Sequence, residues 1–408
     1  MTSSAVLMTP HAQGPRAGAT AHTEGSATRN SLLRASLLLP GLAALSLTAA
    51  VHAEEAPQKT TLAFKYGSYQ DSQAGWDRVK VRAPMVYVQA PLASDWAVEG
   101  SWVGDSVSGA SPRWHTQQSG ASHMSDYRKA ADLKLTRYFS RAAVSASVAY
   151  SDEHDYTSRA LGLDARWSSD DNNRTWTVGY GYASDRIDNT SNGVNTAIDQ
   201  HKRTHELMAG VTQVLSPKDI VQFNLTRSMG QGYYNDPYKQ FDQRPDHRNA
   251  WIALARWNHY LADSASALKG SYRYYSDSFG VAAHTLALDW VKPMGRWTVT
   301  PGVRYYSQSA AQFYFDPVLN PDGSYNLGAT LGRGASITGD KSADQRLAAF
   351  GAVTASIKIA YAIDADTSVD LKLERYRQDS AWRLGGGGSP GLDAFNAQFI
   401  QVGFTHRF

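Results

Sequence analysis

Polar and apolar residues alternate one by one along much of the chain. Residues 369–374 read VDLKLE, residues 221–226 read VQFNLT and residues 78–83 read RVKVRA. Successive side chains of a β-strand point to opposite faces, so a period of two predicts strands with one apolar face. An amphipathic helix would repeat every 3.6 residues instead. The pattern therefore predicts a protein built mainly from strands.

Segments with this pattern recur from residue 59 to the last residue. Each carries apolar side chains on one face and polar or small side chains on the other. We predict sixteen strands, although fourteen or eighteen would also fit the pattern, at residues 59–70, 76–90, 96–109, 127–139, 142–154, 156–168, 174–186, 203–215, 219–230, 248–261, 264–276, 280–292, 296–309, 344–361, 366–378 and 395–408.

The connections between these strands alternate in length. Short turns such as 90–95, 216–218 and 364–365 follow even-numbered strands, whereas the longest polar segments follow odd-numbered strands. These long loops lie at residues 110–126, 187–202, 231–247, 310–343 and 379–394. Short periplasmic turns and long extracellular loops are typical of outer-membrane barrels. An even strand number places both ends of the barrel in the periplasm.

The N-terminal segment differs from the rest. Arg29 and Arg34 precede the apolar run at residues 35–51, and small residues up to Ala53 follow it, which is the order of a secretory signal. We expect residues 1–53 to be a cleaved signal peptide and residues 54–408 to form one domain. Export to the outer membrane of a Gram-negative bacterium follows from that signal together with the strand pattern.

Composition excludes several other classes of protein. The chain has no cysteine, and therefore no disulfide and no thiolate chemistry. The mean hydropathy of −0.42 excludes a bundle of apolar transmembrane helices. Without the signal the chain is close to neutral, which gives no reason to expect nucleic acid as a partner. The fold class predicted is all-β, a transmembrane antiparallel up-and-down barrel, with a soluble β-sandwich as the alternative.

Aromatic residues support the barrel. We expect Tyr138-Phe139, Trp176, Tyr233-Tyr234, Tyr274-Tyr275, Trp297, Tyr305-Tyr306 and Phe313-Tyr314-Phe315 to form girdles at the two membrane surfaces. The last strand alternates apolar and polar residues and ends on Phe408. With Phe404, it resembles the C-terminal signal that the barrel-assembly machinery recognises, although His406 departs from the usual apolar residue.

Several long motifs resemble a family of proteobacterial outer-membrane barrels known as domain of unknown function 3570. The matching segments are TTLAFKY at 60–66, SVSGASPRWHT at 106–116, EHDYTSRAL at 153–161, GYYNDPYKQFDQRPDHRN at 232–249, RYYSDSFG at 273–280, FYFDPV at 313–318 and WRLGGGGSPGL at 382–392. The resemblance implies a barrel and supplies no catalytic residues. It also implies gene neighbours that encode a small lipoprotein, a flavin transferase and a thioredoxin-like protein, so a periplasmic lipoprotein or redox partner is implied.

Three short motifs have simpler structural explanations. Gly387 to Gly391 fits the G-x-S-x-G pattern of hydrolases, but Pro390 has no N–H for an oxyanion hole, so a loop with unusual backbone angles is expected. His201 and His205 lie four apart at a loop-to-strand junction, which is unsuited to a shared metal. The acidic turn Asp152 to Asp155 offers oxygen ligands for a divalent cation, whereas a solvated hairpin tip is the simpler interpretation.

The loop at 231–247 is rich in basic and aromatic residues. Arg244, Asp246 and Arg248 would narrow the lumen if this loop folds inward, and Asp316 supports the same role for residues 310–343. The equally weighted alternative is a loop held by its own Arg–Asp and aromatic contacts. No cofactor site and no metal site are predicted.

The remaining candidate is the lumen. Strand parity predicts an inner wall formed by Lys65, Arg78, Lys80, Arg82, Lys134, Arg166, Lys269, Arg273, Arg304, Lys358 and Lys372, with Glu99, Asp132, Asp164, Glu206, Asp289, Asp370 and Glu374 beside them. An excess of basic groups would give a weakly anion-preferring channel. Alternatively, these charges pair across neighbouring strands and, with inward-folded loops, close the lumen.

The leading functional hypothesis is a channel or transport component for a small solute, in contact with outer-membrane lipid and lipopolysaccharide. A non-enzymatic scaffold for an envelope redox or flavin-linked complex is the alternative. A barrel hydrolase comes third, because no motif places a nucleophile beside a base. The sequence does not indicate an enzyme.

Overall fold

A computed structural model describes residues 55–408, apart from 74–75, 110–123, 190–196, 238, 240 and 323. The predicted signal peptide, residues 1–53, lies outside the described residues. Among the described residues, no helix is long and apolar enough to span a membrane.

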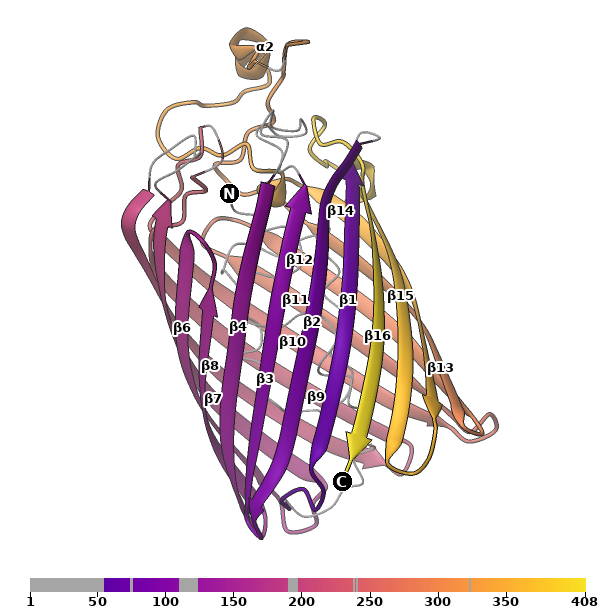
Figure 1. Cartoon of the computed structure of the whole chain (residues 1–408). Helices are drawn as coiled ribbons and strands as arrows, with labels where there is room; N and C mark the ends of the chain where they lie inside the picture. The colour runs from indigo at the N-terminus through magenta and orange to yellow at the C-terminus, as the bar shows by residue number, and fades with distance from the viewer. Residues whose placement is uncertain are drawn as a thin grey trace.

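The described residues form sixteen antiparallel strands that close into one barrel, because β1 pairs with β16 (Figure 1). Every other strand pairs with its neighbours in sequence. The strands are β1 (Thr61–Gln73), β2 (Trp76–Ala93), β3 (Trp96–Gly109), β4 (Met124–Phe139), β5 (Ala142–Asp152), β6 (Tyr156–Ser168), β7 (Arg174–Asn189), β8 (Ala197–Ser216), β9 (Asp219–Gly232), β10 (His247–Leu261), β11 (Ser266–Asp277), β12 (Ala282–Met294), β13 (Trp297–Gln308), β14 (Phe350–Ala362), β15 (Thr367–Asp379) and β16 (Phe395–Arg407).

The predicted all-β barrel and its sixteen strands are confirmed, with two clear differences at strand ends. β14 begins six residues later than predicted, because Gln345–Leu347 form a short 3-10 helix, η2, whose first turn is capped by the Asp344 side chain. β8 begins six residues earlier, at Ala197. After Ala197 and Ile198 its next residues, 199–206, are polar, so they lack the apolar face by which strands are detected.

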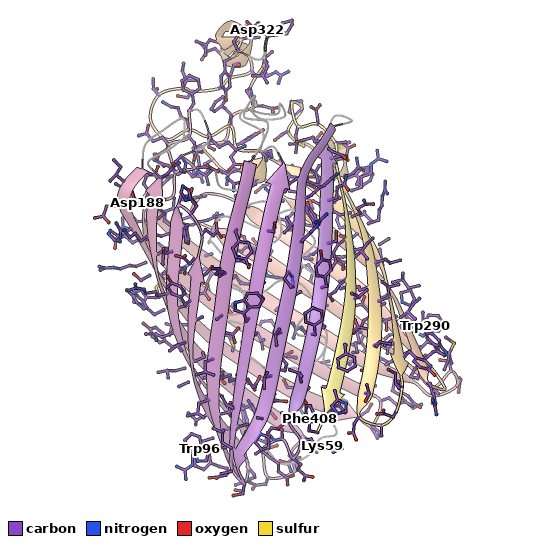
Figure 2. All side chains as sticks on the ribbon, in the orientation of Figure 1. Lys59, Trp96, Asp188, Trp290, Asp322 and Phe408 are labelled. Atoms are coloured by element: carbon purple, nitrogen blue, oxygen red, sulfur yellow. The ribbon has the colours of Figure 1, made fainter. Side chains whose placement is uncertain are left out.

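The two ends of the barrel differ. At one end, called the turn end, consecutive strands are joined by short turns, as at residues 140–141 and 295–296, where Gly295 adopts a φ of +61°. β16 also ends there, and the Phe408 N–H donates to the Thr60 carbonyl at 2.9 Å. Figure 2 shows Lys59, Trp96 and Phe408 at this end. The long connections lie at the opposite end, called the loop end.

Alternation along the strands separates an outer apolar face from an inner face. In β1, the Phe64 side chain is 46% exposed on the outer face, whereas the neighbouring Lys65 is 1% exposed on the inner face. Since exposed leucine, valine and phenylalanine side chains cover the outside of most strands, the surface is suited to lipid rather than water.

Aromatic pairs mark the turn end. The rings of Trp167 and Trp176 stack at 6.1 Å, and those of Trp297 and Tyr361 lie 4.6 Å apart. The girdle prediction is wrong for several other residues, namely Tyr138, Tyr234, Tyr275, Tyr306 and Phe315, which are buried. The last four lie near the loop end, where inward side chains pack against the loops. Tyr138 lies at the turn end and faces inward, where Arg166 lies over its ring.

Candidate functional site

The inner wall of the barrel carries paired charges. Oppositely charged side chains that face inward form ion pairs shielded from solvent, between neighbouring strands, across one intervening strand, or two positions apart on one strand. These pairs are Arg128–Asp105 at 2.6 Å, Lys134–Asp164 at 3.5 Å, Lys202–Asp185 at 3.0 Å and Lys372–Glu374 at 2.9 Å. Charges of the inner wall therefore pair at these four places, while closure of the lumen by a charge network stays a prediction.

Most residues predicted for the inner wall lie there. In most cases at least one neighbour in sequence is exposed on the outer face, and alternation along the strand gives the direction of the others. The residues so placed are Lys65, Glu99, Asp132, Lys134, Asp164, Arg166, Glu206, Lys269, Arg273, Asp289, Arg304, Lys358, Asp370, Lys372 and Glu374. Whether they line a conducting path stays a prediction.

The prediction is wrong for Lys80 and Arg82. Both side chains are exposed on the outer face of β2, and the alternate residues Val79 and Val81 are buried inside. The cause is that β2 extends toward the loop end, where the outside meets polar surroundings and the inside packs against loops. In this part of β2 the polar side chains therefore face outward and the apolar side chains face inward, the reverse of the lipid-facing part of the barrel. The Arg78 side chain lies outside the described part of the chain.

Connections from the loop end fold over and into the barrel. We call residues 233–246, 278–281, 309–349 and 380–394 the plug, leaving aside the undescribed positions within them. Tyr234, Phe279 and Leu347 of the plug pack in one buried apolar cluster with inner-wall residues such as Val81 and Tyr376. By contrast, α2 (Leu327–Gly332) lies beyond the barrel end (Figure 1). The loop end of the interior is therefore filled by an apolar core.

Buried ion pairs tie two loops of the plug together. The Arg244 guanidinium lies 2.9 Å from an Asp242 oxygen and 2.8 Å from Asp344 Oδ2, and none of the three side chains is more than 1% exposed. Arg346 also contacts Asp344, its Nε donating at 2.7 Å. A second contact joins Arg346 to Asp236. These charges hold residues 233–246 against residues 341–347.

The Asp344 carboxylate is the shared acceptor of this cluster. Burial would raise its pKa, but the positive charges of Arg346, Lys239 and Arg244 outweigh burial and hold the pKa well below its usual range. The Asp242 carboxyl behaves differently, since burial raises its pKa with Arg244 opposing. Asp344 is therefore the carboxylate that stays ionised and fixes both arginines.

Of the other residues predicted to narrow the lumen, some are buried and some are exposed at the surface. Arg248 is buried and pairs with Asp277 at 2.6 Å, while Asp246 is exposed beside His247. Asp316 accepts from the Gly391 N–H at 2.7 Å and so links two segments of the plug. Arg244 and Arg248 thus make the Arg–Asp contacts of the structural alternative, and neither presents free charge to the lumen.

The glycine-rich segment is a loop with unusual backbone angles, as expected. Gly385, Gly386 and Gly387 have φ values of +80°, +77° and +68°. Ser389 accepts from the Ala349 N–H through Oγ at 2.9 Å and donates its own N–H to the Ala349 carbonyl at 2.9 Å. The Ser389 hydroxyl is therefore used in a hydrogen bond that holds this loop against Ala349.

The other two motifs lie on the outside of the barrel. His201 and His205 are both exposed on β8, and His205 Nδ1 is hydrogen-bonded to Tyr180 at 2.9 Å. Residues 152–157 border a surface pocket of about 610 Å³ that Arg186 and Asp188 also line. In the described part of the chain, no three His, Asp or Glu side chains are arranged to hold a metal ion.

Strand parity also places inward some charged residues that are absent from the predicted inner wall. Asp105, Arg128 and Asp185 have inward parity in predicted strands, so the same rule would have found them. Lys202 lies in the undetected start of β8. The Arg244–Asp344 pair joins positions one hundred residues apart, so no local sequence pattern predicts it.

Several solved structures match the chain at low sequence identity. The siderophore receptor PirA from Pseudomonas aeruginosa is 11% identical, with 85% of this chain and 62% of the receptor covered and a TM-score of 0.44. A bacterial polysaccharide outer membrane secretin is 9% identical over 86% of this chain and 98% of its own, with a TM-score of 0.48. OccK1 from Pseudomonas aeruginosa is 8% identical over 86% and 98%, with a TM-score of 0.43. This chain spans less than two thirds of the receptor.

No curated protein matches the chain in sequence. A family model does match, at residues 29–125 and 116–399, which together cover most of the sequence. Its extent agrees with the resemblance noted from the motifs between residues 60 and 392. The chain therefore belongs to the family described as protein of unknown function (DUF3570).

Proposed function

We propose that the protein is an outer-membrane channel or transport component for a small solute, gated by its plug. The outer face supports residence in a membrane, because it exposes side chains such as Leu163, Phe223 and Leu286 to the surroundings. The loop end would face the outside of the cell and the turn end the periplasm, since long loops are extracellular in such barrels.

A path for solute is best supported along the inner faces of β5 to β9. Side chains there are small or polar: Ser145, Ser147, Ser158, Gly162, Thr177, Gly179, Gly181 and Gly210. The buried oxygens Thr177 Oγ1, Thr212 Oγ1 and Asn224 Oδ1 have no hydrogen-bond partner among the described residues. Buried polar groups of proteins are nearly always hydrogen-bonded, so this wall is suited to water and to a hydrated solute.

The gate is the observation that carries the proposal. Arg244, Asp242, Asp344 and Arg346 all lie in loops, and within the described ranges none of them forms an ion pair with a strand residue. Separating the two loops would therefore open the barrel while leaving its hydrogen-bonded wall intact. Transport would be passive, through diffusion along the polar wall once the plug loosens.

Single-channel recording of the refolded barrel in a planar bilayer tests this function. Replacing residues 233–246 by a short turn should raise conductance, because it removes Arg244 and Asp242 from the cluster. Deleting only residues 327–332, which form α2, is the matched control and should leave conductance unchanged, since α2 lies beyond the barrel end. Silence of every variant, in protein shown by circular dichroism to be folded, would contradict a channel.

A scaffold for redox partners has less support. The turn end offers short connections such as 94–95 and 217–218, which provide little docking surface. The partners that go with the channel are outer-membrane lipid, lipopolysaccharide and the assembly machinery. Exposure of Phe404 and Phe408 near the turn end supports recognition of β16 by that machinery.

A further inference from the structure

A belt of basic side chains circles part of the outer surface near the loop end. It follows strands β15, β2, β4 and β6 to β9, each of which presents Arg or Lys outward just above its apolar residues. The residues of this basic belt are Lys80, Arg82, Lys129, Arg159, Arg186, Arg203, Arg227, Arg375 and Arg377. Its position, directly above lipid-facing side chains, places cations where lipid headgroups begin.

Two members of the basic belt frame a compact site on β6, β7 and β8. In the strand register Arg159 is opposite Ser184, and Ser184 is opposite Arg203. Two strand spacings amount to about 10 Å between the two backbones. Both arginines are exposed on the outer face, with the Ser184 side chain between them. The row therefore offers two guanidinium groups and a hydroxyl to one ligand on the outside of the barrel.

The residues below this row are those of a lipid-binding surface. Leu161 and Leu163 follow Arg159 on β6 and are 40% and 54% exposed, and Leu207 follows Arg203 on β8. Trp167, which belongs to the aromatic pair of the turn end, is eight residues from Arg159. At about 3.3 Å per residue that is about 26 Å along the strand. Strands of such barrels tilt by about 35–45°, so the rise along the membrane normal is about 20 Å. The long Arg159 side chain therefore lies close to the opposite edge of an apolar band about 25 Å tall.

The charges at this site are not neutralised by their neighbours. No described residue forms an ion pair with Arg159 or Arg203. In contrast, the outward arginines of the turn end have partners: Arg137 lies 3.6 Å from Asp95, and Arg174 donates to Gln213 at 2.6 Å. Arginine is suited to phosphate because its planar group donates two parallel hydrogen bonds.

We infer that Arg159, Ser184 and Arg203 bind the phosphorylated headgroup of an outer-leaflet lipid, whose acyl chains lie over Leu161, Leu163 and Leu207. Two arginines and a hydroxyl satisfy the phosphate oxygens, and the leucines below bury hydrocarbon. The assignment rests on the orientation proposed above, in which the loop end faces the outer leaflet. It needs no conduction through the lumen.

The test is binding of bis-phosphorylated lipid A to the purified full-length barrel in detergent, measured by native mass spectrometry. The double variant Arg159→Gln, Arg203→Gln should bind about thirtyfold more weakly, since each basic group at an anionic lipid surface contributes about 1 kcal/mol. The matched control Arg137→Gln, Arg174→Gln removes the same charge at the turn end and should bind normally. Dephosphorylated lipid A should bind weakly to every variant.

Equal weakening in the two double variants, or tight binding of dephosphorylated lipid A, would overturn the site. Conductance of the Arg159→Gln, Arg203→Gln barrel separates this site from the channel. A conducting wild-type barrel that shows no preference for phosphorylated lipid A rejects the lipid site alone. A silent wild-type barrel that binds phosphorylated lipid A through these arginines rejects the channel alone.

Discussion

Arg244 donates to Asp344 across one hundred residues of sequence, with 2.8 Å between Nη2 and Oδ2 and both side chains at most 1% exposed. The pair belongs to a wider contact between two loops, which also exchange two backbone hydrogen bonds of 2.7 Å between Gln243 and Lys341. Removing one member of a buried ion pair costs about 3–5 kcal/mol, because the other charge stays buried without its partner. The plug should therefore depend on Asp344.

Asp344→Asn leaves Arg244 and Arg346 without their shared carboxylate. We expect the variant to keep the barrel and to loosen the plug, seen as a higher open probability in planar bilayers and faster proteolysis within residues 233–246. Asp246→Asn makes the same chemical change at an exposed position of the neighbouring loop and should match the wild type. Identical proteolysis of the two variants would show that the cluster does not hold the plug.

The cluster also predicts how the plug responds to pH. Arg346, Lys239 and Arg244 hold the pKa of Asp344 below its usual value near 4. A carboxyl whose pKa is lower in the folded state stabilises that state above its unfolded pKa and loses this contribution as pH falls through the folded pKa. Burial raises the pKa of Asp242, so its protonation favours the closed plug rather than opening it.

The open probability should therefore stay low from neutral pH to about pH 4 and rise only in stronger acid. Single-channel recordings at a series of pH values check this. Asp344→Asn should remove the rise, because no carboxyl is left to titrate at that position. A rise centred near pH 6 in the wild type would assign the response to another group.

A close backbone contact holds the plug segment 380–394 against β14. A side chain at Gly351 would place its Cβ 1.9 Å from the Trp382 carbonyl oxygen, which belongs to the 3-10 helix η3 (Ser380–Trp382). Gly351→Ala should push this helix away and weaken the 2.6 Å hydrogen bond from the Tyr305 hydroxyl to that oxygen. We expect a loss of about 1–3 kcal/mol in the free energy of unfolding, as for other overpacked sites.

Urea titration of the refolded barrel measures this loss. Gly270→Ala is a matched control, because the nearest atom to its added Cβ is 3.6 Å away, in ordinary contact. If both variants unfold at the same urea concentration, the segment 380–394 is not held by the approach of Trp382 to Gly351.

The barrel could be predicted because its physical cause is local. Each strand, such as 369–374, shows its own alternation, and the wall follows from pairing neighbours in order. The inward direction of Lys134 and Asp370 followed from the same parity. The rule failed at Lys80 and Arg82, because parity gives two faces but not which of them is outside. That assignment depends on the height of the residue relative to the lipid.

The plug could not be predicted, since its contacts are non-local. The sequence predicts that Arg244 either narrows the lumen or pairs within its own loop, and it places Asp344 at the start of a strand, so no pattern pairs the two. The apolar core beneath them draws on Val81, Phe279 and Leu347 from distant segments. For aromatic residues near strand ends, the sequence alone does not distinguish a position in the membrane-surface girdle from an inward position against the plug. The fold of the loops alone decides between these two positions.

The C-terminal residue makes a separate prediction about assembly. Phe408 is 65% exposed, and its ring meets that of His406 edge to face at 4.6 Å. Phe408→Ala should lower the amount of folded barrel in outer membranes several-fold without changing the stability of what does fold, since the exposed ring packs little. Heat-modified migration in gels reports the folded fraction. Phe139→Ala, which removes an exposed aromatic ring at the same end, should leave the amount unchanged.

The absence of cysteine from the chain allows its orientation to be measured directly. Asp322 lies beyond the loop end (Figure 2), and Asp171 lies in the turn between β6 and β7. With loops outside the cell, Asp322→Cys should react with a membrane-impermeant maleimide in intact cells. Asp171→Cys should react only after the outer membrane is opened, because its turn faces the periplasm. The reverse labelling pattern would mean that the barrel has the opposite orientation in the membrane. The basic belt would then lie at the inner leaflet, and Arg159 and Arg203 could not bind an outer-leaflet lipid.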